Sequence, residues 1–389
     1  MKKIIALALT ICMLMLCSIT PALADVAGLS DVAYAPADTS MLDQEVLNNL
    51  PHYKFAFSYY AFTDKLSQQF KGCLEYLGAA FNVEFVFFES GMGDEAVTNI
   101  ESILAAGDID GVIYVGGSQA LLDVCEKYQV PFISACGFPS TEVEQQGCAS
   151  YSMYLGGVVD DDIWAGTQCV QALYDAGCRN FCFSGATQGL VKSHDDREKA
   201  MQAFIAEHTD MNLLSESLTM METANDIATF AASFGGLMDG YISTAASDAT
   251  YQALSSEGLD DGSVKYATVD ISSQTGVYFQ NGVQVWTCGG QYPTVMVAFA
   301  VLYNYLSDGV QMIEDKTQPL TRKYIEITSY EDYENYCKYI ESDVPGYTAE
   351  EISKMMLVFN PDVTIADLQA DADTYSLSDV MERHADLIG

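Results

Sequence analysis

Residues 53–81 read YKFAFSYYAFTDKLSQQFKGCLEYLGAAF, a short apolar strand followed by a helix whose apolar residues recur every three or four positions. The pattern returns at Phe181-Cys182-Phe183, which precedes a second helical stretch from Ala200 to Ile205. Alternating strands and helices indicate a parallel sheet, because parallel neighbours need a crossover of a dozen or more residues. We therefore predict the α/β class, with two doubly wound parallel-sheet lobes and a ligand cleft between them.

The beginning of the chain has the pattern of a secretory signal peptide. Lys2 and Lys3 precede an apolar run from Ile4 to Cys17, and Ala22-Leu23-Ala24 supplies small residues for cleavage. The run of 14 residues is short for a membrane span, which needs about 20. We predict that residues 1–24 are removed and that the chain is exported.

Cys17 offers an alternative, the attachment of a lipid after processing. The residue before it is the bulky Leu16, whereas lipoprotein signals have a small residue there. The expected location is therefore periplasmic, extracellular or at the cell surface. No direct membrane insertion of the mature chain is expected unless Cys17 is lipidated.

The charge of the chain limits its partners. It carries a formal net charge of −37, with 54 acidic against 17 basic residues. Phosphate binding needs Lys and Arg, so this composition argues against nucleic acid and anionic membranes as partners. The acidic surface is expected to keep an exported monomer soluble.

Nine of the eleven cysteines in the chain follow the leader. Because nine is an odd number, they cannot all pair within the molecule. Most of them lie inside apolar elements, as Cys182 does. In such a place cysteine acts as a small buried apolar side chain. The sequence leaves the disulfide status open.

Changes of composition and periodicity divide the chain. A change of lobe is expected near Leu155 to Asp160, and Asp161 is expected to cap a helix over 162–175. A strand is expected over 323–328, after a third crossover between the lobes. The predicted parts are a connecting segment (25–52), an N-terminal lobe (53–157 plus 292–318), a C-terminal lobe (158–291 plus 319–344) and an acidic helical tail (345–389).

Four stretches of the chain resemble the type I periplasmic-binding-protein family, in its sugar-binding branch, which also includes the effector domains of LacI-type repressors. They are Asp108-Ile-Asp-Gly-Val-Ile113, Asp161-Asp-Ile-Trp-Ala-Gly166, Asp239-Gly-Tyr-Ile242 with Ala246-Ser-Asp248, and Val269-Asp270 followed by Gly290-Gln-Tyr-Pro293. The likeness runs in consistent order over residues 53–330. An export signal precedes it rather than a helix-turn-helix, so the resemblance implies a solute receptor and not a repressor.

The resemblance also implies site residues, because the ligands of this family bind at the carboxyl ends of the strands. Asp270 and Gln291 fall on positions that hydrogen-bond the ligand. Ser247 or Asp248 occupies the place of the usual Asn-Asp pair, and Arg197 lies within one residue of the cleft arginine of the family.

Two departures from the family pattern matter. Cys136-Gly137 stands where the sugar binders have Asp-Arg, and Lys65-Leu66 replaces a Phe pair, although Tyr60 and Phe62 lie just upstream. Cys136 is therefore a candidate ligand contact that offers a thiol where the family has a carboxylate. Both departures weaken the expectation of a ribose-like ligand.

Recognition of hydroxyl groups needs fixed acceptors and donors beside a flat apolar surface. Asp270 supplies an acceptor, Gln291 both kinds of group and Arg197 a donor fork, while Tyr60 and Phe62 supply the surface. The alternatives are structural: Asp270 as a turn residue, Gln291 as a hinge hydrogen bond and Asp248 as a helix N-cap.

Catalysis, metals and cofactors have no support in the sequence. The four histidines show no metal-binding spacing, and Ser118 lies outside any G-x-S-x-G elbow. We predict a non-enzymatic solute-binding protein that captures a small polar ligand, foremost a sugar, and delivers it to the membrane subunits of an ABC permease. The alternative is a receptor for a membrane sensor kinase or chemoreceptor, with a nucleoside or an amino-acid-like ligand.

Overall fold

The computed structural model describes residues 32–91, 94–117, 119–189, 191–219 and 223–388 of the 389-residue chain. The predicted signal peptide 1–24, with Cys17, lies outside these residues, as do the first residues of the connecting segment 25–52 and the serine at 118. In the described part, none of the helices has the length and apolarity that crossing a membrane would take.

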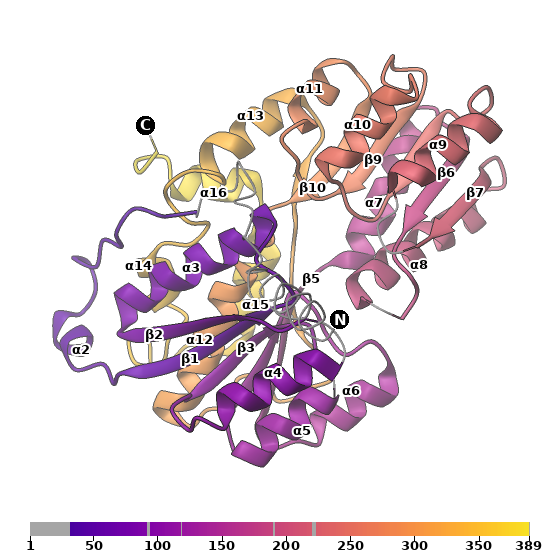
Figure 1. Ribbon diagram of the computed structural model, residues 1–389. Helices are drawn as coiled ribbons and strands as arrows, with labels where there is room; N and C mark the ends of the chain where they lie inside the picture. The colour runs from indigo at the N-terminus through magenta and orange to yellow at the C-terminus, as the bar shows by residue number, and fades with distance from the viewer. Residues whose placement is uncertain (1–31, 92–93, 118, 190, 220–222, 389) are drawn as a thin grey trace, which may run out of the picture.

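Two six-stranded sheets form the centres of two lobes (Figure 1). Sheet A has the order β11-β5-β4-β3-β1-β2 and sheet B the order β12-β10-β9-β8-β6-β7, so equivalent strands take the same places in both sheets. All neighbours pair in parallel except β10 and β12. The strands of sheet A are β1 (Tyr53–Tyr59), β2 (Val83–Glu89), β3 (Gly111–Val115), β4 (Phe132–Ala135), β5 (Tyr154–Asp160) and β11 (Leu320–Arg322). Those of sheet B are β6 (Asn180–Gly185), β7 (Asn212–Leu218), β8 (Gly240–Ser243), β9 (Lys265–Val269), β10 (Gln284–Gly289) and β12 (Ile325–Ile327).

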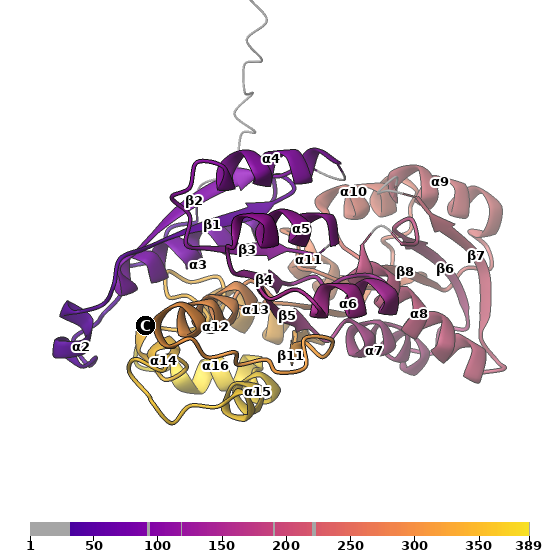
Figure 2. The same cartoon turned by 90° about the horizontal axis from the view of Figure 1, so that it is seen from below.

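Helices cover both faces of sheet A, because successive residues of a strand point to opposite faces. Phe55 and Phe57 of β1 pack with α3 and α12, while Ala56 between them packs with α4 and α5. Figure 2 shows α4 on one side of the sheet and α12 on the other. The helices of this lobe are α3 (Lys65–Phe81), α4 (Asp94–Leu104), α5 (Gln119–Tyr128), α6 (Glu142–Ala149) and α12 (Thr294–Asp308).

Sheet B is covered in the same way. Phe181 and Phe183 of β6 pack with α7 and α8, and Cys182 between them packs with α9 and α10. The predicted fold class, two doubly wound parallel-sheet lobes, is confirmed. The helices here are α7 (Asp162–Asp175), α8 (Lys192–Glu207), α9 (Thr223–Phe234), α10 (Asp248–Ser256) and α11 (Thr275–Gln280).

Three crossovers join the lobes, at the carboxyl ends of β5, β10 and β11. We call them crossover 1 (160–162), crossover 2 (289–294) and crossover 3 (322–325). Asp161 in crossover 1 caps α7 as predicted, since its Oδ1 accepts a hydrogen bond from the Trp164 amide at 2.9 Å.

The predicted lobe boundaries need two corrections. The expected change of lobe at Leu155 to Asp160 is strand β5, which pairs with β4 and β11, so sheet A continues to Asp160. The strand predicted over 323–328 forms as β12 of sheet B, but β11, which precedes it and belongs to sheet A, was not predicted. Residues 320–322 therefore belong to the N-terminal lobe and not, as predicted, to the C-terminal lobe.

Two glycines explain why β5 does not look like a buried strand in the sequence. A Cβ on Gly156 would lie 2.9 Å from Ile313, and one on Gly157 would lie 2.7 Å from Phe138. Glycine is needed at both positions for packing, although it is uncommon within strands.

The C-terminal tail packs on the N-terminal lobe and contains α14 (Ala349–Ser353), α15 (Ile365–Thr374) and α16 (Leu377–Arg383). The amide of Asn304 in α12 holds it by donating to the Met355 carbonyl at 2.9 Å and accepting from the Leu357 amide at 2.7 Å. Before the tail, α13 (Tyr330–Tyr339) packs against α11 of the C-terminal lobe and against α16. At the other end of the described chain lies the short α2 (Gln44–Asn48).

The nine cysteines after the leader are all unpaired, and seven of them are buried. Burial raises the pKa of Cys182 to about 11. These seven thiols are packing side chains, as the sequence predicts for most of the nine.

Candidate functional site

The carboxyl ends of both sheets lie at the boundary between the lobes, because the chain leaves sheet A at the end of β5 and sheet B at the end of β10. Open α/β sheets bind ligands at this edge. We therefore expect a ligand between the ends of β1, β3 and β4 on one side and the equivalent ends of β6, β8 and β9 on the other, and we call this region the cleft.

Cys136 and Asp270 occupy equivalent positions, directly after β4 and β9, and both have left-handed backbones, with φ of 54° and 74°. Gln291 of crossover 2 lies between them. Its Nε2 donates to Asp270 Oδ1 at 2.5 Å, and the Cys136 thiol points at the Gln291 carbonyl at 3.9 Å. Left-handed non-glycine residues cost energy and cluster at functional sites. Three predicted site residues thus meet at the base of the cleft.

Aromatic side chains line the N-terminal wall, where β1 ends. The rings of Tyr59 and Tyr60 lie 4.6 Å apart, and Phe62 lies 6.4 Å from Tyr59. Tyr60 is 43% exposed, and its hydroxyl donates to Asp64 at 3.2 Å. Burial and the Asp64 carboxylate raise the pKa of Tyr60 to about 12, so it remains a neutral donor. Tyr60 and Phe62, both predicted as ligand contacts, are therefore part of this wall.

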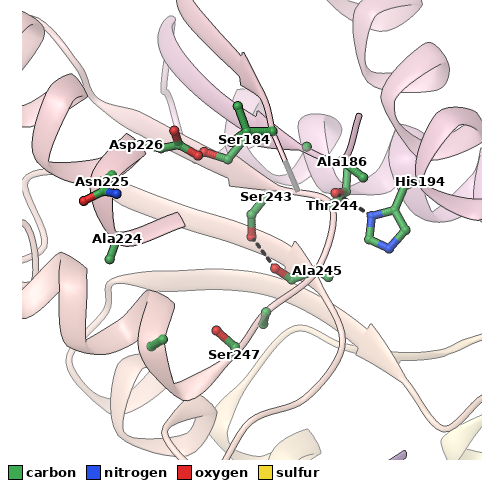
Figure 3. Close-up of a pocket in the computed structure, with 14 residues that line it drawn as sticks. Ser184, Ala186, His194, Ala224, Asn225, Asp226, Ser243, Thr244, Ala245 and Ser247 are labelled. Atoms are coloured by element: carbon green, nitrogen blue, oxygen red, sulfur yellow. Dashed lines mark hydrogen bonds between the residues drawn. The ribbon is translucent and has the colours of Figure 1, made fainter. Parts of the chain in front are cut away.

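A hollow of about 280 Å³ lies in the C-terminal wall (Figure 3). Its lining comes from the ends of β6 and β8 and the first turns of α9 and α10, and includes the hydroxyls of Ser184, Ser243 and Thr244. His194 Nδ1 lies 2.8 Å from the Thr244 hydroxyl, and burial, helped by Arg197, lowers the pKa of His194 to about 3. The imidazole is therefore neutral, and the hollow combines hydroxyl groups with alanine methyl groups.

Arg197 is buried and held by protein acceptors on all three nitrogens. Nε donates to Asp162 at 2.7 Å, Nη1 to the Thr244 carbonyl at 2.8 Å and Nη2 to the Tyr324 hydroxyl at 2.7 Å. Since Asp162 belongs to crossover 1 and Tyr324 to crossover 3, Arg197 ties two crossovers to the floor of the hollow. Its predicted contact with a ligand stays a prediction.

Ser247 and Asp248 begin helix α10 at the edge of the hollow. Ser247 is the N-cap, since its hydroxyl accepts from the Thr250 amide. The alternative that makes Asp248 the N-cap is therefore wrong by one residue. Asp248 instead accepts from the Ser273 hydroxyl at 3.0 Å, while Ser247 lines the hollow (Figure 3).

A buried polar group that the sequence analysis missed joins the three crossovers. The Thr294 hydroxyl lies between Arg322 Nη1, at 2.8 Å, and Asp160 Oδ1, at 2.9 Å. Arg322 is fully buried, 3.9 Å from Asp160, and its guanidinium stacks 4.2 Å from the ring centroid of Tyr375. The signal for it in the sequence is a charged residue at the end of β5 and another at the end of β11.

Asp160 gives a first prediction, on pH. Burial raises the pKa of Asp160 to about 7, although Arg322 opposes the rise. The folded chain then binds more protons than the unfolded chain, so this residue makes stability fall as the pH rises from about 4 to about 7. Asp160→Asn is expected to remove that part of the slope.

The measurement is the free energy of unfolding in urea at several pH values across this window. Relative to the variant, the wild type should be most stable at the low end and lose its advantage toward neutral pH. Equal slopes for both chains would contradict the assignment.

Comparisons with known proteins agree with this architecture. No protein-family model and no curated protein matches the chain. Solved structures do match: a galactofuranose binding protein has 13% identity and a TM-score of 0.57, over 66% of this chain and 90% of its own. A periplasmic ribose ABC transporter from Conexibacter woesei has 15% identity and a TM-score of 0.59, over 74% of this chain and 95% of its own. A carbohydrate transporter from Acidothermus cellulolyticus, in complex with myo-inositol, has 17% identity and a TM-score of 0.58, over 75% of this chain and 99% of its own.

At these identities the likeness shows the fold, and the fold is that of the type I periplasmic binding proteins. The expected resemblance is thereby confirmed at the level of the fold. The residues that would contact a ligand in this chain follow from its own geometry.

Proposed function

We propose that this chain is an exported solute-binding protein that captures a small polar ligand between its lobes, without chemical turnover. The observation that carries the proposal is the meeting of Cys136, Asp270 and Gln291 at the base of the cleft. Cys136 and Asp270, which directly follow the strand ends, have left-handed backbones. Gln291, which lies between them, belongs to crossover 2. A ligand bound at this point would contact both lobes and crossover 2, which connects them.

The chemistry of the walls favours a sugar or sugar-like molecule. Asp270 offers a carboxylate acceptor, Gln291 an amide, and the hollow several hydroxyls. Tyr60 offers an exposed ring on which the apolar face of a sugar ring would lie. The solved structures with this fold include binders of galactofuranose and myo-inositol, which supports the same class of ligand.

Capture would proceed by bending at the three crossovers, which brings the two walls onto the ligand. The closed form would then deliver the ligand to an ABC permease, as the fold relatives described as ABC transporters suggest. Export by the predicted signal peptide 1–24 is part of the proposal, and so is action as a monomer.

The experiment is mass spectrometry of the purified chain, first under native and then under denaturing conditions. We expect a bound molecule of about the mass of a monosaccharide, released on unfolding, and exchangeable for an added sugar without a change in its mass. A ligand-free protein that also takes up nothing from a panel of sugars, polyols and nucleosides would contradict the proposal. A change in the mass of the added sugar would contradict the absence of turnover.

A further inference from the structure

Crossover 2 contains a residue suited to act as the pivot of the hinge. Gly290 has a left-handed backbone, with φ of 72°, and connects β10 to the turn before α12. Bending between lobes is absorbed by changes of φ and ψ at a few residues of this kind. The orientation of the Gly290 carbonyl therefore reports the state of the hinge.

Tyr375, in the C-terminal tail, holds that carbonyl. Its hydroxyl donates to the Gly290 oxygen at 3.2 Å, and its ring is fully buried with the Arg322 guanidinium 4.2 Å from the centroid. One side chain thus contacts crossover 2 through its hydroxyl and crossover 3 through its ring. Neither contact involves the cleft.

The tail fixes Tyr375 to the N-terminal lobe. The side chain of Gln369 in α15 pairs with the backbone of Thr321 in β11, donating at 2.8 Å and accepting at 3.3 Å. The Tyr375 ring also stacks on Tyr347, with centroids 5.7 Å apart. Since α15 is bound to sheet A, the Tyr375 hydroxyl cannot follow the Gly290 carbonyl if the C-terminal lobe turns.

We assign the described conformation to the open state. Across residues 32–91, 94–117, 119–189, 191–219 and 223–388, no hydrogen bond or ion pair joins a strand-end loop of sheet A directly to one of sheet B. The link from Cys136 to Asp270 runs through Gln291 of the hinge. The bond from Tyr375 to Gly290 therefore belongs to the open state.

We propose that Tyr375 is a positioning residue for ligand binding: its hydroxyl latches the hinge in the open state and so sets the affinity for a ligand that it does not touch. This inference rests on the hinge closure of the proposed function. Apparent affinity rises with the fraction of molecules that are closed before binding. The C-terminal tail is then a part of the hinge and not only a cover of the N-terminal lobe.

Tyr375→Phe tests the latch, because it removes the hydroxyl and keeps the ring on Arg322. The control is Tyr278→Phe, since the Tyr278 hydroxyl donates to the Tyr251 carbonyl at 2.6 Å within the C-terminal lobe. Both variants lose one buried bond from tyrosine to a backbone carbonyl. Only the first bond lies at a crossover.

The readout is the distance, without ligand, between spin labels carried by unnatural amino acids at two exposed positions, Val143 in α6 of the N-terminal lobe and Val191 at the N-cap of α8 in the C-terminal lobe. We expect Tyr375→Phe to shift the distribution toward short distances, and Tyr278→Phe to leave it as in the wild type. Binding of the co-purified ligand should tighten by roughly two- to tenfold, as the loss of one hydrogen bond to the open state implies.

An unchanged distribution for Tyr375→Phe, or an equal shift for Tyr278→Phe, would overturn the latch. The distance measurement needs no ligand. A failure to find any ligand would therefore reject the proposed function and leave the test of the latch intact.

Discussion

Asp270→Asn is expected to weaken ligand binding by about ten- to a hundredfold and to leave the lobes folded. The reason is that a hydrogen bond to a charged acceptor is worth about 1.5–3 kcal/mol, and asparagine removes the charge. Asparagine also tolerates the left-handed backbone at this position, where φ is 74°, and still accepts from Gln291. The loss would therefore report the carboxylate and not a change of backbone. Titration calorimetry with the co-purified ligand measures it.

The control for this variant is Asp239→Asn. Asp239 lies at the opposite end of sheet B, where its carboxylate accepts from the amides of Arg179 and Asn180 at 2.9 and 2.7 Å. This change is expected to lower stability and to leave the affinity unaltered. If Asp270→Asn bound as tightly as the wild type, or if Asp239→Asn lost as much affinity, the cleft would be misplaced.

Arg322→Leu is expected to lower the free energy of unfolding by about 3–5 kcal/mol at pH 8. The change removes the fully buried cation that lies 3.9 Å from Asp160, so an ionised carboxylate would be left buried without its partner. At pH 5 the loss should be smaller, because burial keeps Asp160 largely protonated there, with a pKa of about 7. Unfolding in urea at the two pH values measures both effects.

Arg179→Leu is the matched control, since this arginine also stacks on a tyrosine and pairs with a carboxylate. Its guanidinium lies 3.8 Å from the Tyr174 ring and 2.9 Å from Asp210, but its side chain is 34% exposed. Exposed pairs contribute about 1 kcal/mol or less. A loss at Arg322 no greater than at Arg179 would contradict the account of the hinge. Adding Asp160→Leu to Arg322→Leu should recover part of the loss, because no buried charge then remains.

Local patterns were sufficient to predict most elements of the fold. The strand and helix within 53–81, the strand at Phe181–Phe183 and the helix over 162–175 all form where the sequence predicts them. Each shows a clear apolar pattern or a capping residue, which are properties of a short stretch of chain. Strand β5 was missed because Gly156 and Gly157 serve packing by distant side chains.

The site was predictable only where it depends on strand ends. Cys136 and Asp270 directly follow strands β4 and β9, and equivalent strand ends meet in a two-lobed fold. The partners of Arg197 could not be predicted, because Asp162, Thr244 and Tyr324 are brought together by long-range topology. The same holds for Tyr375, whose bond to Gly290 spans 85 positions of the sequence.

The most direct test of the central claim, that the cleft at Asp270 binds a small polar ligand, is the unfolding temperature of the chain from Asp25 onward. It would be measured, after removal of bound ligand, against a panel of sugars, polyols, nucleosides and amino acids. A ligand at about 100 times its dissociation constant stabilises by roughly 2.7 kcal/mol, which raises the unfolding temperature by several degrees. We predict such a rise for one class of ligand, foremost a sugar, and its loss in Asp270→Asn at the same concentration. No rise with any compound, or an equal rise in the variant, would contradict the account.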